Sequence, residues 1–183
     1  MPTVLVPLAQ GCEELEAVTI IDLLRRAGAD VLTAGLDAQP VTGAHRVMIT
    51  PDTTLEEALD RDFDLIVLPG GLPGADNLKN DERIVECVKK MADAGKLTAA
   101  ICAAPIVLEK AGVLSGKKAT SYPGFLDEMG LPDVTYTGAA VEKDGNVITS
   151  RGPGTAMDFA LDLIAALYDV ETRDKIEAAL VRN

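Results

Sequence analysis

Short apolar runs alternate with segments of helical periodicity along most of the chain, and this alternation constrains the fold more than any other feature. Four runs are predicted to be buried strands: residues 4–8, 31–35, 64–68 and 97–101. Helices are predicted between and after them, over residues 14–27, 55–59, 81–94 and 105–111. Buried strands that alternate with helices are typical of a parallel sheet with helices on both faces. We therefore predict one α/β domain over residues 1–183.

The pattern changes near the C-terminus. An Asp-Gly turn separates residues 139–143 from residues 146–150, which predicts an antiparallel hairpin at an edge of the sheet. A helix is predicted over residues 156–167, and Thr155 with Asp158 has the spacing of a capping box at its start.

Charge and composition disfavour several classes of protein. The chain has 17 Lys+Arg against 29 Asp+Glu, and its net charge of −12 repels nucleic-acid backbones and anionic membrane surfaces. No apolar run approaches the roughly 20 residues of a membrane helix, and the first residues lack the basic region of a signal peptide. Three cysteines without zinc-like spacing predict a reducing, cytoplasmic location. The single histidine, His45, excludes HExxH zinc sites, and we expect no metal and no organic cofactor.

Cys102 is the strongest candidate for a reactive residue. It lies between a predicted strand and a helix marked by Pro105, and the small Ala103 and Ala104 suit the sharp turn of a nucleophile elbow. Unpaired backbone N–H groups and the helix dipole favour a thiolate there. We therefore expect the pKa of this thiol to fall below the free value of about 8.5. The alternative is a buried cysteine that acts only as a small apolar side chain.

A glycine-rich turn follows another predicted strand at the same edge of the sheet, where α/β proteins bind ligands. Gly70 and Gly71 allow close approach of the backbone to a ligand, and the N–H of Gly71 is a candidate oxyanion donor. A plain turn is the alternative.

Three carboxylates, Glu13, Glu14 and Glu16, stand near the N-terminus of the first predicted helix. Most acids in such places are solvated and complement the helix dipole. Glu16 follows Leu15, which we expect to face the core, and we expect Glu16 to point over the strand ends toward Cys102. A partly buried glutamate has a raised pKa and can exchange protons near neutrality.

The remaining candidates have structural interpretations. His45 lies in a polar, turn-like stretch and is expected at the surface, although it is also a candidate to reach a partner subunit. Cys87 falls within a predicted helix and is expected to be structural. Cys12 precedes the acidic helix, and a resolving thiol for Cys102 is the less favoured interpretation.

Four segments match one protein family in order and spacing: GCEELE at residues 11–16, LPGG at 68–71, AAICAAP at 99–105 and TSRGPGTA at 149–156. Over essentially its whole length the chain resembles the ThiJ/PfpI family. Within this family it looks most like the branch of the parkinsonism-associated protein deglycase (DJ-one) and its bacterial relatives. The resemblance implies one class I glutamine amidotransferase-like domain over residues 1–183, a flavodoxin-like α/β/α sandwich and a homodimer.

The resemblance also implies a site. By position, Cys102 matches the nucleophile of the family, Glu16 its carboxyl partner, and Gly71 and Ala103 the backbone donors around the sulfur. Family members are credited with cofactor-free conversion of methylglyoxal or glyoxal to hydroxyacids and with removal of early glyoxal adducts from proteins. They are also described as oxidative-stress sensors and chaperones.

At two positions the sequence differs from family members that carry a histidine, and this limits the reactions that Cys102 can catalyse. Tyr122 stands where animal members place a histidine near the cysteine, and Ala103 stands where the peptidase branch has one. No histidine follows Cys102, so chain order excludes a Cys-His-acid triad within one chain. Proteolysis and glutamine hydrolysis, which need a base to activate sulfur and protonate an amine, are therefore disfavoured.

We predict a cysteine-dependent glyoxalase or protein deglycase that acts without a cofactor on small 2-oxoaldehydes or glycated protein side chains. The predicted catalytic residues are Cys102 and Glu16, and the predicted oxyanion and substrate residues are Gly70, Gly71, Ala103 and Tyr122. One alternative is a non-catalytic oxidative-stress sensor or chaperone whose Cys102 oxidises to sulfinic acid. Another is a structural α/β module with a buried thiol.

Overall fold

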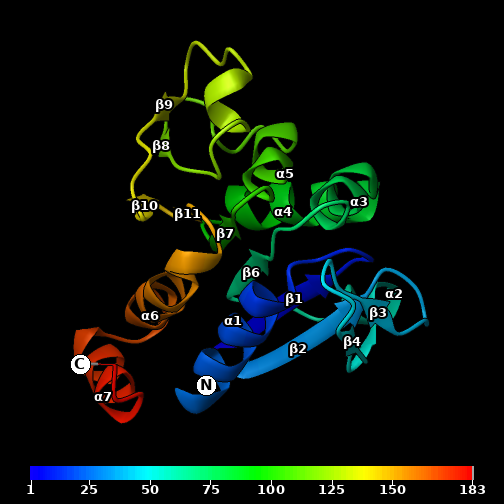
Figure 1. Ribbon diagram of the computed structural model, residues 1–183, viewed down its shortest axis with the longest axis vertical. Coiled ribbons are helices and arrows are strands. Elements are labelled where there is room, and N and C mark those ends of the chain that lie inside the picture. Colours follow the sequence, from blue (N-terminus) through cyan, green and yellow to red (C-terminus); the bar gives the residue numbers. More distant parts are fainter. Residues whose placement is uncertain (183) are drawn as a thin grey trace.

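The computed structural model describes residues 1–182. A seven-stranded sheet forms the centre of the protein (Figure 1). Its strands are β1 (Thr3–Leu8), β2 (Asp30–Gly35), β5 (Thr53–Thr54), β6 (Leu65–Leu68), β7 (Leu97–Ile101), β10 (Val141–Asp144) and β11 (Val147–Ser150). They lie in the order β10-β11-β7-β6-β1-β2-β5, and every pair is parallel except the β10–β11 hairpin. The predicted parallel sheet with an antiparallel edge is confirmed.

Helices cover both faces of this sheet (Figure 1). One layer consists of α1 (Glu14–Arg26) and α6 (Ala156–Leu167), with α7 (Val170–Ala179) packed against α6. The other consists of α2 (Leu55–Ala58), α3 (Gly74–Asn80), α4 (Glu82–Asp93) and α5 (Pro105–Lys110). The three-layer, flavodoxin-like sandwich is therefore as predicted. No helix within residues 1–182 has the length and apolarity to cross a membrane.

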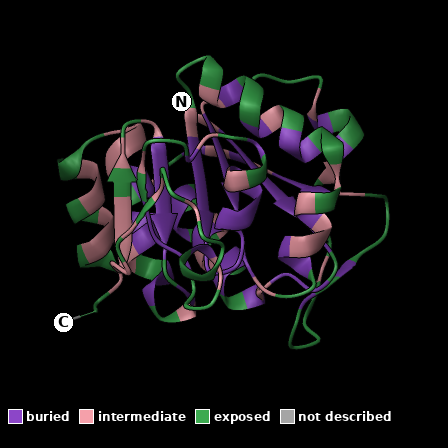
Figure 2. Ribbon diagram, turned by 90° about the horizontal axis from the view of Figure 1, so that it is seen from above, coloured by how far each residue is buried: buried purple, intermediate pink, exposed green. Residues whose placement is uncertain are grey.

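The central strands are buried (Figure 2), and their side chains alternate between two cores, one on each face of the sheet. Val4 and Val6 of β1 pack in the core beneath α1 and α6, whereas Leu5 packs in the core beneath α3, α4 and α5. Successive side chains of a strand point to opposite faces, so a strand buried on both faces must be apolar throughout. This explains why the strand-like runs in the sequence are continuous rather than alternating.

Several short elements were not predicted. The helix α3 lies in a stretch for which no helix or strand was predicted. Two small sheets pair β3 (Val41–Thr42) with β4 (Met48–Ile49) and β8 (Lys118–Ala119) with β9 (Thr135–Tyr136). Two 3₁₀ helices cover Leu126–Glu128 and Pro153–Thr155. Strands of two residues are too short to produce a periodic pattern.

The predicted capping box at the start of α6 is wrong. The Thr155 side chain does not cap this helix. Its hydroxyl instead lies 2.7 Å from Ser150 Oγ and accepts a hydrogen bond from Gly152 N at 3.1 Å. Thr155 thus ties the loop after β11 to the end of that strand.

The parallel strands place four loops at one edge of the sheet. Direct backbone bonds join these loops: Glu13 N donates to Gly70 O at 2.8 Å, and Cys102 N donates to Ser150 O at 3.0 Å. The segments after β1, β6, β7 and β11 therefore meet, as the rule for ligand sites in α/β sheets predicts.

Candidate active site

Cys102 occupies a strained turn between β7 and α5. Its φ of +64° lies in the left-handed region, which a residue with a side chain rarely adopts. The turn is held on both sides, because Cys102 N donates to Ser150 O and Tyr122 N donates to Cys102 O at 2.8 Å. Strain of this kind persists where the surrounding structure fixes it, and it is concentrated at functional sites. The geometry is that of the predicted elbow.

Glu16 lies in the first turn of α1 and is fully buried. Its Oε2 accepts a hydrogen bond from Gly70 N at 2.8 Å, whereas Oε1 has no hydrogen-bond partner among residues 1–182. The thiol of Cys102 is close enough that each group shifts the pKa of the other. The structure therefore brings together the two residues that the sequence analysis paired.

The pKa of the thiol departs from the expected direction. Burial, and then the negative charge of Glu16, raise the pKa of Cys102 to about 12, while the N–H groups of Gly71 and Ala103 lower it by less. The expected fall below about 8.5 is therefore wrong for a thiol that faces an ionised Glu16. The sequence indicated the backbone N–H groups near the sulfur. It did not indicate how deeply Cys102 is buried, or how far the Glu16 carboxylate raises the pKa of the thiol.

Glu16 itself titrates near neutrality. Burial raises the pKa of its carboxyl from 4.5 to about 7, against the opposing effects of the Gly70 N–H and the Cys102 thiol. Two ionisable groups that interact this strongly gain and lose protons as a pair. Near neutral pH the pair therefore loses the first of its two protons.

The glycine turn after β6 fits between these two side chains. A Cβ on Gly70 would lie 2.6 Å from the Cβ of Cys102 and 2.9 Å from Glu16 Oε2. Gly71 has a φ of +88°, and a Cβ there would lie 2.4 Å from Glu13 N. The N–H of Gly70 is already bonded to Glu16, so of these two glycines it is Gly71 that directs its N–H toward the sulfur, as Ala103 also does. Gly70 is therefore placed as a positioning residue rather than an oxyanion donor.

Tyr122 lies beside the cysteine turn in an open pocket of about 410 Å³. The lining residues are Tyr122, Pro123, Arg151, Gly152, Pro153, Gly154 and Thr155. The tyrosine ring packs against Gly152, where a Cβ would come within 3.2 Å of the ring, and 48% of the residue is exposed. Its phenol is therefore accessible to a small molecule in this pocket.

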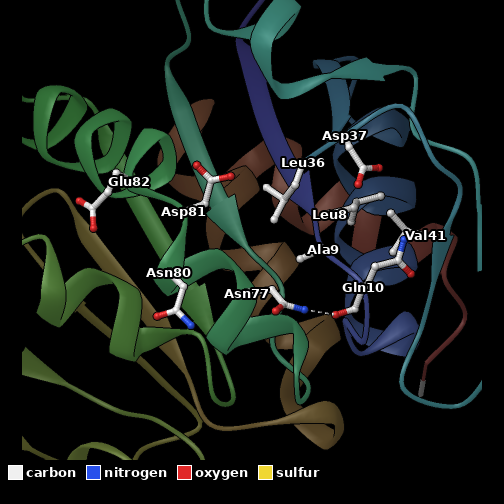
Figure 3. A pocket seen from close by; sticks show the side chains of 10 residues that line it. All are labelled: Leu8, Ala9, Gln10, Leu36, Asp37, Val41, Asn77, Asn80, Asp81 and Glu82. Atoms are coloured by element: carbon white, nitrogen blue, oxygen red, sulfur yellow. Dashed lines mark hydrogen bonds between the residues drawn. The ribbon is translucent and has the colours of Figure 1, made fainter.

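A second pocket, of about 490 Å³, lies at the ends of β1 and β2 (Figure 3). Acidic and amide side chains dominate its polar lining, and Asn77 Nδ2 donates to the Gln10 carbonyl at 2.9 Å (Figure 3). Its lining residues include no cysteine and no histidine. The nucleophile therefore identifies the edge near Cys102 as the better candidate site.

The two other cysteines, His45 and Glu14 lie outside the pair formed by Cys102 and Glu16. Cys12 is buried, and burial together with Glu14 and Glu13 raises its pKa to about 11, which disfavours the thiolate that a resolving cysteine needs. Cys87 is partly buried in α4, and burial raises its pKa. His45 is exposed, as expected. The expectation that Glu14 is solvated is wrong, because the loop over residues 43–47 buries it.

Comparison with known proteins identifies the family. The profile of the DJ-1/PfpI family matches residues 2–166. The chain belongs to this family. A "Parkinson disease protein 7 homolog" from Danio rerio is 44% identical over 180 residues, which cover 97% of this chain and 95% of the relative. A protein named a deglycase from Pyrococcus abyssi is 38% identical over 164 residues, which cover 90% of this chain and 98% of the relative.

Two plant relatives are longer. "Protein DJ-1 homolog A" from Arabidopsis thaliana is 45% identical over 181 residues, or 98% of this chain. This chain spans 46% of the length of that relative and 41% of the length of homolog B from the same plant.

Solved structures of relatives confirm the fold. Drosophila melanogaster DJ-1beta superposes with a TM-score of 0.94 at 42% identity, covering 98% of this chain and 97% of that one. Toxoplasma gondii DJ-1, described as oxidized, superposes with a TM-score of 0.93 at 39% identity. The match covers 99% of this chain and 98% of that one.

Replacing Gly70 with alanine tests how closely the glycine turn is fitted to the pair. The added methyl group has no room, so we expect a loss of roughly 1–3 kcal/mol of stability in urea unfolding. We also expect a changed rate of Cys102 alkylation. Gly154→Ala is the matched control, because a Cβ there meets nothing within 4 Å. Equal effects of the two substitutions would contradict the fit described here.

Proposed function

We propose that the protein is a cofactor-independent glyoxalase and protein deglycase that acts on methylglyoxal, glyoxal or their early protein adducts. The observation that carries the proposal is the buried pair of Cys102 and Glu16, with the N–H groups of Gly71 and Ala103 beside the sulfur. The P. abyssi relative that is named a deglycase supports the same activity.

The first step is addition of sulfur to the aldehyde carbon of a 2-oxoaldehyde. As the C–S bond forms, the Glu16 carboxylate takes the proton of the Cys102 thiol. A carboxyl with a pKa of about 7 is suited to this transfer, because it is partly ionised at neutral pH yet basic enough to accept a proton. An aldehyde is a stronger electrophile than an amide, so no histidine is needed to activate the sulfur or protonate a leaving amine.

The oxygen of the adduct develops negative charge next to the sulfur. The N–H groups of Gly71 and Ala103 already face that sulfur and are positioned to donate to this oxygen. Oxyanion donors of this kind contribute roughly 3–4 kcal/mol each to the transition state. The oxygen then receives the proton held by Glu16, which gives a neutral hemithioacetal and restores the carboxylate.

Glu16 next moves a proton from the aldehyde-derived carbon to the neighbouring carbonyl, through an enediol-like species. The first carbon is oxidised to a thioester and the second is reduced to an alcohol, so no external oxidant enters. Hydrolysis of the thioester releases the 2-hydroxyacid and restores the thiol. The exposed phenol of Tyr122 is proposed to donate a hydrogen bond to the second oxygen of the substrate.

Turnover of methylglyoxal to lactate tests this mechanism. We expect no lactate from Cys102→Ser and a fall of about 10²–10⁴-fold in kcat/KM for Glu16→Gln, because the transferred proton loses its acceptor. Wild-type turnover should rise with pH to a plateau above about 7, where Glu16 is ionised. Cys87→Ser is the control, because Cys87 lies on another helix. Its kcat/KM should stay within about twofold of the wild-type value. Lactate formation that survives Cys102→Ser would end the proposal.

A redox sensor is the second candidate function, and the oxidized T. gondii relative is the observation that favours it. In a sensor, Cys102 would be oxidised by a peroxide to sulfinic acid, held by a hydrogen bond from the protonated Glu16 carboxyl. Methylglyoxal would then give a stoichiometric adduct without lactate, and mild peroxide would add two oxygen atoms at Cys102. Mass spectrometry after each treatment separates this function from the enzyme.

We also propose that the protein forms a homodimer through the outer face of α1 and the neighbouring β4 strand. The apolar side chains Leu15 and Val18 of α1, with Val47 and Met48, are each at least half exposed. The expectation that Leu15 faces the core is therefore wrong. Val47 N donates to Glu14 at 3.2 Å, so the loop and the helix form one surface.

Sedimentation equilibrium tests the dimer. The wild-type chain should sediment at twice its 19.2 kDa mass, and Val18→Glu should sediment as a monomer because it places a charge in the interface. Val170→Glu is the control, because it changes an exposed valine on α7, away from this face. A monomeric wild type would contradict the interface.

A further inference from the structure

Three side chains with metal-ligand chemistry meet outside the cysteine site. Glu13 and Glu14 lie at the start of α1, and His45 lies on the loop before β4. His45 Nδ1 is 3.4 Å from Glu13 Oε2 and 3.5 Å from Glu14 Oε2. One potential ligand atom from each of the three lies within 4.8 Å of the others. Folding thus joins residues that are about thirty positions apart in the sequence.

Glu14 is the member of this cluster that most needs a ligand. The residue is 7% exposed, and its Oε1 accepts hydrogen bonds from His45 N at 2.8 Å and Val47 N at 3.2 Å. Its Oε2 is buried and has no hydrogen-bond partner among residues 1–182. This is the oxygen that faces the His45 ring. A buried charged oxygen is costly unless it is paired or coordinates a metal.

The loop leaves space for this carboxylate. A Cβ on Gly43 would lie 2.6 Å from Glu14 Cδ and 2.7 Å from Oε2. Any residue other than glycine at position 43 would therefore displace the carboxylate from the loop.

The charge of the chain favours the approach of a cation to this cluster. Its net charge is −12, so the protein as a whole attracts cations.

We propose that Glu13, Glu14 and His45 form a binding site for a divalent transition-metal cation such as Zn²⁺. Zinc takes carboxylate oxygen and histidine nitrogen at about 2.0–2.2 Å, so tetrahedral ligand atoms lie about 3.4 Å apart. The two distances from Nδ1 match this separation. The imidazole disfavours Mg²⁺ and Ca²⁺, which prefer oxygen ligands. Three protein ligands leave one position for water or another molecule.

This site is separate from the proposed reaction. Neither Cys102 nor Glu16 is among the three ligands, and no step of the proposed mechanism uses them. Local ligand spacings in the sequence predict no metal, because this cluster forms only when the loop that carries His45 folds over α1.

Because the chain has one histidine, its imidazole signals in NMR spectra are unambiguous. Zn²⁺ added to the metal-free full-length protein should shift these signals and saturate at one ion per chain. Calorimetry should give the same stoichiometry. Signals that do not move, or that move only in parallel with nonspecific broadening of the whole spectrum, would overturn the site.

Variants identify the ligands by calorimetry with the same Zn²⁺ probe. Glu14→Gln and His45→Gln should each weaken binding at least about tenfold, since each removes one of three protein ligands. His45 is exposed, so its substitution should leave thermal stability unchanged. Glu56→Gln, at an exposed acid on α2, and Cys102→Ser should bind Zn²⁺ as wild type does. Equal affinity of wild type and His45→Gln, or loss of binding in Cys102→Ser, would contradict the proposal.

Discussion

The proposed function depends on the closeness of the Glu16 carboxyl to the Cys102 sulfur. Burial makes ionisation of each group costly, and it raises both pKa values. The rest of the local structure serves to keep the two groups together. Gly70 fixes the carboxylate through its N–H and leaves room for both side chains, and the strained backbone at Cys102 fixes the sulfur.

Much of this arrangement follows from patterns that a sequence carries directly. Continuous apolar runs predict strands buried on both faces, and the carboxyl ends of parallel strands must converge, so Glu16, Gly71 and Cys102 were expected at one edge. The parts that could not be predicted depend on distant contacts. The pKa of Cys102 reflects its burial and a charge from another helix. The burial of Glu14 reflects a loop about thirty residues away.

The start of α1 carries acidic residues with two different proposed roles, proton transfer and metal binding. Successive residues of a helix are rotated by about 100°, so Glu14 and Glu16 point to different sides of α1. Glu16 faces the sheet and the cysteine, whereas Glu13 and Glu14 face the loop that carries His45. A run of acids that resembles ordinary dipole-complementing residues thus contains one proposed proton acceptor and two proposed metal ligands. Their burial, rather than their spacing, distinguishes them from solvated acids.

The pH dependence of Cys102 alkylation tests most directly whether Glu16 accepts the proton of the thiol. Mass spectrometry of the peptide that contains Cys102 separates it from Cys12 and Cys87. In the wild type, the rate should rise with a midpoint near pH 7, where the pair loses its first proton. In Glu16→Gln the proton acceptor is gone and burial remains, so the midpoint should move above the free value of about 8.5. A midpoint shared by the two proteins would contradict the account.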